Sequence, residues 1–196
     1  MHECTPVQAR TYTHTSVHGQ VRRIENLAMW RLYCAQRTFV RQNCRHGARK
    51  PVRVACFGDW MKEHALWSDC NEVYLFHGTK PAAVPLITKQ GFETRVPADA
   101  GRMLGDGVYF AENASKSDQY GVPQGQKFYL FVARVCLGAA YGCDSPQLGI
   151  KRPPETRAGG PLFDSVIYTR SGKHREFVVY DRTACYPEFL LEYERI

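Results

Sequence analysis

The pattern of apolar and polar positions predicts helices mainly in the first third of the chain and strands in the rest. From Val21 to Gln42, apolar residues recur every three or four positions, which places them on one face of an amphipathic helix. The run DWMKEHALWSDC, residues 59–70, predicts a second short helix. PAAVPLITKQGF, residues 81–92, predicts a third, with proline in its first turn and glycine at its end.

Six apolar runs predict β-strands. In EVYLFH, residues 72–77, alternate side chains share a face, so Val73 and His77 are expected on the face opposite Tyr74. The other runs are VYF, FYLFVARVCL, FDSVIYTR, EFVVYD and FLLEYERI, at residues 108–110, 128–137, 163–170, 176–181 and 189–196. Because strands outnumber helices and several are apolar on both faces, the expected fold class is α+β, with two packed, mainly antiparallel sheets and peripheral helices.

The length and composition fit one domain. The chain has 196 residues, 44% of them hydrophobic, which is enough for a single core. Residues 1–20 are polar without a sustained period and are expected to form a tail, which leaves 21–196 as the domain. No apolar stretch approaches the roughly 20 residues that span a bilayer, and no secretory signal opens the chain. We therefore expect an intracellular protein, cytoplasmic or nuclear, with no membrane partner.

Cysteine and histidine spacing argues against metal sites and disulfides. The eight cysteines contain no C-x-x-C pair, and none of the seven histidines has zinc-finger spacing from a cysteine pair. The chain is also long for a disulfide scaffold. The expectation is reduced thiols and no structural metal.

The formal net charge of +7 is concentrated in the first third, where arginines alternate with aromatic residues between residues 21 and 53. A solvated helix face explains this pattern, and contact with nucleic acid through the same basic third is the alternative. A basic surface attracts any polyanion, including a dinucleotide, without specifying one.

Two motifs suggest a site for a flat polar ring. In HGT, Gly78 follows His77 and allows a ligand to approach the backbone N–H and C=O groups. In GDGVYFAENASKSDQY, a short helix is expected over residues 114–120, with Ser117 and Tyr120 on the same side. A hydroxyl beside an aromatic ring suits a planar ligand that carries a carboxamide, and Tyr109 can provide a second aromatic wall.

A third motif, HREFVVYD, places an acid in an apolar strand. Glu176 shares a face with Val178 and Tyr180, opposite Phe177 and Val179. A carboxylate there is costly to bury unless it is hydrogen-bonded. Either it is an edge residue in water or it has a functional role.

The segments YLFHGT, GDGVYFAENASKSDQY, FDSVIY and EFVVYDRTACYPEFLLEY, in that order, resemble the catalytic domain of the poly(ADP-ribose) polymerases. The resemblance covers about residues 20–196. IENLAMWRLYCAQR is similar to the opening helix of members that lack an autoinhibitory helical subdomain. The resemblance implies the ADP-ribosyltransferase fold, with NAD as substrate, no metal and proteins as acceptors.

The resemblance also implies a triad of histidine, tyrosine and glutamate, which falls on His77, Tyr109 and Glu176. In such enzymes the histidine holds a ribose hydroxyl of NAD. The glutamate binds the 2′-hydroxyl of the donor ribose and stabilises the oxocarbenium-like charge that develops when nicotinamide leaves.

The remaining implied contacts bind the dinucleotide. The backbone of Gly78 and the hydroxyl of Ser117 would hold the nicotinamide carboxamide. Tyr109 and Tyr120 would enclose the nicotinamide ring, and Thr79 would lie near the adenosine ribose.

The sequence departs from the family pattern at Leu104, where phenylalanine is common, and GVPQGQK is too short for the zinc-binding segment of tankyrases. Because the triad ends in glutamate, we expect poly- or oligo-ADP-ribosylation of proteins, including automodification. The alternatives are a mono-ADP-ribosyltransferase acting on protein or nucleic acid, and an inactive module that binds NAD without turnover.

Overall fold

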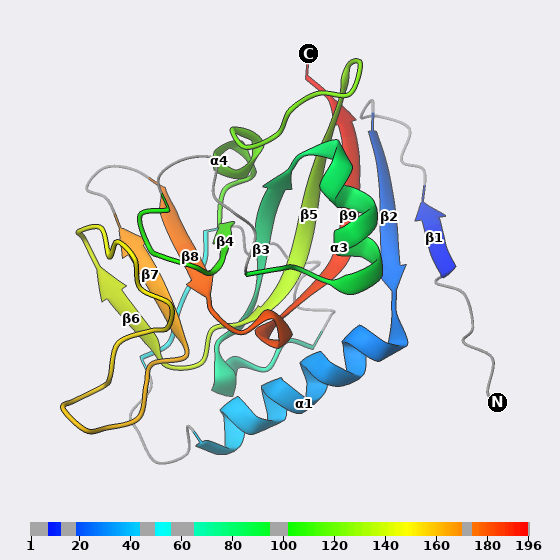
Figure 1. The fold of residues 1–196 in the computed structure, drawn as a ribbon. Helices are drawn as coiled ribbons and strands as arrows, with labels where there is room; N and C mark the ends of the chain where they lie inside the picture. Colours follow the sequence, from blue (N-terminus) through cyan, green and yellow to red (C-terminus); the bar gives the residue numbers. More distant parts are fainter. Residues whose placement is uncertain are drawn as a thin grey trace.

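The computed structural model describes residues 8–12, 19–43, 50–55, 65–94, 102–169 and 174–195. These residues form one nine-stranded β-sheet with helices around it (Figure 1). The strands are β1 Gln8–Tyr12, β2 Gly19–Glu25, β3 Glu72–Thr79, β4 Val108–Ala111, β5 Lys127–Cys136, β6 Ala140–Cys143, β7 Ser165–Thr169, β8 Arg175–Val179 and β9 Cys185–Glu194. The α-helices are α1 Leu27–Asn43, α3 Val84–Gln90 and α4 Ala114–Asp118, and 3-10 turns span Ser68–Cys70, Pro81–Ala83 and Arg182–Ala184.

The strand order is β1-β2-β9-β5-β3-β4-β8-β7-β6, and only β6 and β7 pair in parallel among the described strands. The predicted α+β class and mainly antiparallel pairing are confirmed, but the prediction of two separate sheets is wrong. Phe76 of β3 pairs with Ala111 of β4 and joins the two halves into one sheet. The apolar runs indicated burial on both faces but carried no information on which strand edges pair.

The beginning of the chain differs most from the sequence prediction. The helix expected from Val21 begins only at Leu27, because residues up to Glu25 belong to β2. β2 pairs with β9, so a partner distant in sequence overrides the helical spacing. Gln8–Tyr12, within the segment expected to be a tail, forms β1 and pairs with β2.

Later elements follow the prediction more closely. α3 occupies the predicted region and ends at Gly91, whose φ of 82° suits glycine. α4 is shorter than expected, and the side chain of Asn113 makes no capping bond to it. The first half of the helix predicted over 59–70 lies outside the described residues, and its second half, residues 65–70, is helical only in the 3-10 turn Ser68–Cys70.

The main core lies between the sheet and α3, which lies in front of β9 and beside β5 in Figure 1. Val73 of β3 packs there with Phe92 and Phe131, whereas Tyr74 packs with Val132 on the opposite face. The predicted alternation of β3 is therefore confirmed. No helix in the described part of the chain is long and apolar enough to cross a membrane.

A buried network of charges attaches α1 to the sheet. Glu72 Oε1 accepts hydrogen bonds from the Tyr33 hydroxyl at 2.6 Å and from Arg37 Nη1 at 2.9 Å. Arg134 Nε donates to Glu188 Oε2 at 2.9 Å and Arg134 Nη1 lies 3.4 Å from Glu72. Removing one member of such a network leaves an uncompensated buried charge.

We expect Glu72→Ala to lower the free energy of unfolding by about 3–5 kcal/mol, because Arg37 loses its buried counter-ion and Arg134 loses one of the carboxylates with which it pairs. Urea unfolding followed by circular dichroism measures the change. Arg41→Ala is the control, because it breaks a half-exposed pair with Asp69 and should cost at most about 1 kcal/mol. Equal losses in the two variants would contradict the assignment of this network as the anchor of α1.

Candidate functional site

The residues singled out from the sequence gather where the two halves of the sheet meet. Phe76 of β3 lies opposite Ala111 of β4, and Ala111 lies opposite Glu176 of β8. His77 follows Phe76 directly, and Tyr109 is two residues before Ala111. The backbone therefore brings His77, Tyr109 and Glu176 onto three neighbouring strands at one junction.

The two strands at the junction separate immediately. β3 pairs with β5 from Glu72 to Thr79, but the described residues of β4 pair with β3 only at Phe76. The edge of β3 beyond Phe76 is thus free of strand pairing on the β4 side. This is the edge that carries His77 and Gly78.

His77 fills part of this gap. Its Nδ1 lies 2.8 Å from the carbonyl oxygen of Tyr109, and its ring packs against Phe92 and Phe110 with centroid distances of 4.9 and 5.7 Å. Because a carbonyl only accepts, Nδ1 must carry the proton of the neutral ring. Burial lowers the pKa of His77, and the bond to Tyr109 only partly opposes this. The ring is therefore neutral at physiological pH and presents an unprotonated Nε2.

Tyr109 is held by the backbone of the preceding segment. Its hydroxyl accepts from the N–H of Leu104 at 3.0 Å and donates to the carbonyl of Gly105 at 2.8 Å. Burial raises the pKa of Tyr109 to about 12, so the phenol stays protonated. Leu104, where the resembled family commonly has phenylalanine, is fully buried and packs with Val166 and Val178. The phenol is thus fixed, and its ring rather than its proton is available to a ligand.

α4 lies very close to β3. Ser117 Oγ donates to the carbonyl of Phe76 at 2.9 Å, and a Cβ added at Gly78 would lie 1.8 Å from the Ser117 carbonyl oxygen. No side chain fits there without moving the helix. Glycine at position 78 is therefore required by the packing of α4, a reason that the sequence analysis did not give.

The carboxylate of Glu176 is buried and paired. Only 6% of the residue is exposed, and Lys116 Nζ of α4 lies 2.8 Å from its Oε1. Burial lowers the pKa of Lys116, but the hydrogen bond and charge of Glu176 outweigh it and raise that pKa overall. Of the two interpretations offered by the sequence, an edge residue in water is wrong. Oε2 has no hydrogen-bond partner among the described residues.

Sequence reasoning missed Lys116. Its Nζ lies 5.3 Å from the ring centroid of Tyr120, four residues later, whose side chain is exposed with the residue 56% accessible. The spacing of four on a short helix was the available signal. Lys116 therefore contacts both the ring of Tyr120, just after α4, and the carboxylate of Glu176 on β8.

A second ion pair beside Glu176 was also missed. Arg175 Nε and Nη2 bond to the two carboxylate oxygens of Glu112 at 2.8 and 2.6 Å, and the N–H of Ala55 donates to Glu112 Oε2 at 2.7 Å. This bidentate pair ties residues 50–55 to β4 and β8. It joins the residue before Glu176 to the residue after β4.

The side chains fall into two groups. His77 lies on the α3 face of the sheet, whereas Tyr109 and Glu176 lie on the opposite face. The described residues show no direct bond among these three side chains, and His77 reaches the backbone of Tyr109 instead. Thr79, at the end of β3, is buried. The arrangement can hold an extended ligand that passes the open β3 edge and meets groups from both faces.

Comparison with known proteins matches residues 6–195 to the family model of the poly(ADP-ribose) polymerase catalytic domain. The protein mono-ADP-ribosyltransferase PARP12 of Homo sapiens is 27% identical over 175 residues, covering 89% of this chain and 21% of the relative. PARP11 of Homo sapiens, which is also named a protein mono-ADP-ribosyltransferase, is 26% identical over 195 residues. The match covers 89% of this chain and 50% of the relative. PARP10 of Mus musculus, also named a protein mono-ADP-ribosyltransferase, is 30% identical over 199 residues. The match covers 97% of this chain and 18% of the relative. The chain therefore spans between about a fifth and a half of the length of these relatives.

Gly78→Ala should lower the free energy of unfolding by about 1–3 kcal/mol or more, because the methyl group collides with the Ser117 carbonyl and pushes α4 away from β3. Gly142→Ala is the matched control, since nothing lies within 4 Å of its added Cβ. Urea unfolding measures both variants. A neutral Gly78→Ala would contradict the close packing of α4.

The stability of the protein should fall as the pH drops below about 6.5, the ordinary histidine pKa, because the unfolded chain takes up a proton that the partly buried His77 resists. The stabilisation that results from the lowered pKa of His77 is fully present above that pH. It is lost as the pH falls toward the lower pKa of the folded state. His77→Gln should flatten this acid slope, whereas His174→Gln should retain it. Unfolding free energies measured between pH 5 and 8 provide the test, and parallel slopes for His77→Gln and the wild type would refute it.

Proposed function

The chain belongs to the poly(ADP-ribose) polymerase catalytic domain family, and we propose that it transfers single ADP-ribose units from NAD to protein acceptors. The observation that carries this proposal is the match over nearly the whole chain, together with relatives that are named as protein mono-ADP-ribosyltransferases. These names favour mono-ADP-ribosylation, the alternative in the sequence analysis, over the poly- or oligo-product expected from the glutamate.

The donor would bind along the open edge of β3. The backbone of Gly78 would hold the nicotinamide carboxamide. Ser117 Oγ already donates to Phe76, so it would accept from the amide –NH2. Tyr120, which is exposed and stands at the end of α4, would cover one side of the nicotinamide ring, with the ring of Tyr109 on the other side.

The neutral imidazole of His77 would bind a ribose hydroxyl of NAD. Its Nε2 is an acceptor, which matches the hydrogen of a hydroxyl group. Thr79, two residues further along β3, would lie toward the adenosine ribose. These contacts position the donor, and positioning accounts for much of the catalysis when the leaving group is already good.

Glu176 would act at the bond that breaks. Departure of nicotinamide leaves positive charge on the ribose, and a carboxylate beside it stabilises that charge. Lys116 holds Oε1 of Glu176, which leaves Oε2 for the 2′-hydroxyl of the donor ribose. The triad of this chain would then be His77, Tyr109 and Glu176, with Lys116 as the residue that orients the acid.

Glu176→Gln should retain the fold and NAD binding but lower nicotinamide release from NAD by about 10²–10³-fold, the usual loss for one transition-state contact. Glu155→Gln, in the exposed loop after β6, is the control and should keep full turnover. Chromatography of nicotinamide measures the rate. Unchanged release by Glu176→Gln would remove this acid from the mechanism.

Mass spectrometry of the protein after incubation with NAD tests the product. Single ADP-ribose units on protein side chains are expected. Chains of ADP-ribose would contradict mono-transfer, and label on RNA or DNA but never on protein would favour a nucleic-acid acceptor. NAD binding without nicotinamide release would identify an inactive module.

A further inference from the structure

α1 carries two apolar rows on different sides. The inner row, which packs on the sheet, contains the buried Tyr33 and Val40. On the outer side, apolar residues recur at spacings of four, three and four, and all of them are exposed: Ala28, Leu32, Ala35 and Phe39. Leu32 is 53% exposed and Phe39 is 57% exposed. We call these four residues the outer stripe.

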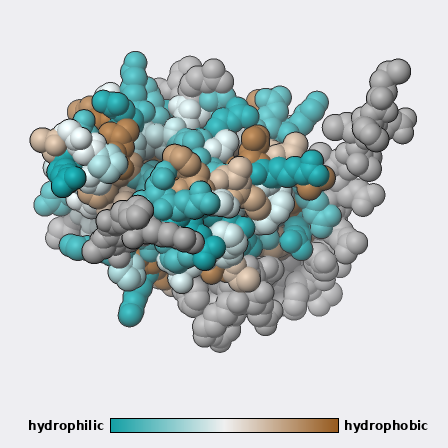
Figure 2. Space-filling model, turned by 90° about the horizontal axis from the view of Figure 1, so that it is seen from below, coloured by the Kyte–Doolittle hydropathy of each residue, from teal (hydrophilic) through white to brown (hydrophobic). Residues whose placement is uncertain are grey.

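The spacing of the outer stripe is that of a heptad seam. Small residues alternate with large ones along it, and the stripe extends for about 17 Å at 1.5 Å per residue. Figure 2 views the molecule from the side on which α1 runs, and brown and tan residues lie there among teal ones. An exposed stripe at this spacing is the surface that an amphipathic helix recognises.

The charge on α1 selects the kind of helix. α1 contains three arginines and no acidic residue. Arg37 is buried against Glu72, and Arg41 pairs with Asp69. Arg31, exposed beside the outer stripe, forms no ion pair with the residues that the structure describes. A partner that fits would bring carboxylates to the flank of its apolar seam.

We propose that the outer stripe of α1 is a docking surface for an amphipathic helix with acidic flanking residues, supplied by another polypeptide. Leu32 and Phe39 insert into the apolar seam of that helix, and Ala28 and Ala35 let its backbone approach. Arg31 pairs with a flanking carboxylate and sets the direction of the helix. A second copy of α1 fits less well, because it would bring arginine against arginine.

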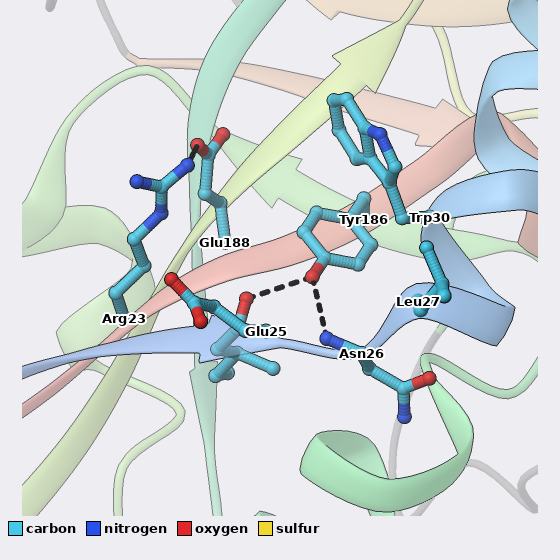
Figure 3. Close-up of a pocket in the computed structure, with 8 residues that line it drawn as sticks. Arg23, Glu25, Asn26, Leu27, Trp30, Tyr186 and Glu188 are labelled. Atoms are coloured by element: carbon cyan, nitrogen blue, oxygen red, sulfur yellow. Dashed lines mark hydrogen bonds and ion pairs between the residues drawn. The ribbon is translucent and has the colours of Figure 1, made fainter. Parts of the chain in front are cut away.

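The pocket at the beginning of α1 lies on another side of the helix. It has a volume of about 280 Å³ and is lined by Arg23, Glu25, Leu27 and Trp30, with Tyr186 (Figure 3). The hydroxyl of Tyr186 donates to the carbonyl of Ile24 and accepts from the N–H of Asn26, and Arg23 pairs with Glu188 at 3.5 Å. Tyr186, Arg23 and Glu188 are thus paired within the chain, and the docking surface does not include this pocket.

The test uses a fluorescent 21-residue peptide designed as an amphipathic helix, with leucine in the seam and glutamate on both flanks. Its twin carries lysine in place of every glutamate. Fluorescence anisotropy with the whole chain should show binding of the glutamate peptide and at least about tenfold weaker binding of the lysine peptide.

The double variant Leu32→Asp/Phe39→Asp should weaken binding of the glutamate peptide by about tenfold or more. Leu86→Asp on α3, at a residue 58% exposed, is the matched control and should bind normally.

Arg31→Glu supplies the decisive comparison, because reversing this charge should make the lysine peptide bind better than the glutamate peptide. Each variant is accepted only if its thermal unfolding and nicotinamide release match the wild type. Equal binding of both peptides to the wild type, or full binding by the double variant, would overturn the proposal. The proposal would also be overturned if sedimentation showed a dimer of the wild type that dissociates in Phe39→Asp. That result would assign the outer stripe to a second copy of the chain. RNA binding lost in Arg31→Glu but kept in the double variant would assign the surface to nucleic acid instead.

Discussion

The early end of the ladder between β3 and β4 is the constraint on which the candidate site depends. β3 pairs with β5 over its whole length, but the described residues of β4 pair with it only at Phe76 and Ala111. Because the strands then separate, the imidazole of His77 can reach the carbonyl of Tyr109 and α4 can settle on Gly78. Continued pairing would occupy the β3 edge, along which the proposed dinucleotide would bind.

The buried carboxylates of Glu72 and Glu176 on this sheet differ in their hydrogen-bond partners. Glu72 is enclosed by donors, with Tyr33 and Arg37 on one oxygen and the N–H of Trp67 on the other at 2.7 Å. It serves to fix α1. Glu176 has one side-chain partner within the described part of the chain, Lys116, on Oε1. Since burial of a charge is tolerated only when it is compensated, Lys116 offsets the charge of the acid and leaves Oε2 able to accept a further bond.

The sequence predicted the strands that carry the site because their patterns are strong. β3, β5 and β8 are dense in β-branched and aromatic residues, and period two within them correctly placed Glu176 with Val178 and opposite Phe177. The same reasoning failed over Val21–Glu25, where helical spacing and strand pairing compete and β9 supplied the deciding partner. It also could not predict the contact of Lys116 with Glu176, because the two residues are 60 positions apart in sequence.

The sequence by itself determined the α+β class, the approximate position of most strands and the motifs that identify the family, since these depend on local spacing and on residue types. The tertiary structure alone decided that the strands form one sheet rather than two, that Gly78 is bare because the Ser117 carbonyl lies against it, and that His77 approaches Tyr109 through the backbone. The physical reason is that hydrogen bonding between strand edges, and the close approach of α4 to β3, join segments whose separation no local pattern encodes.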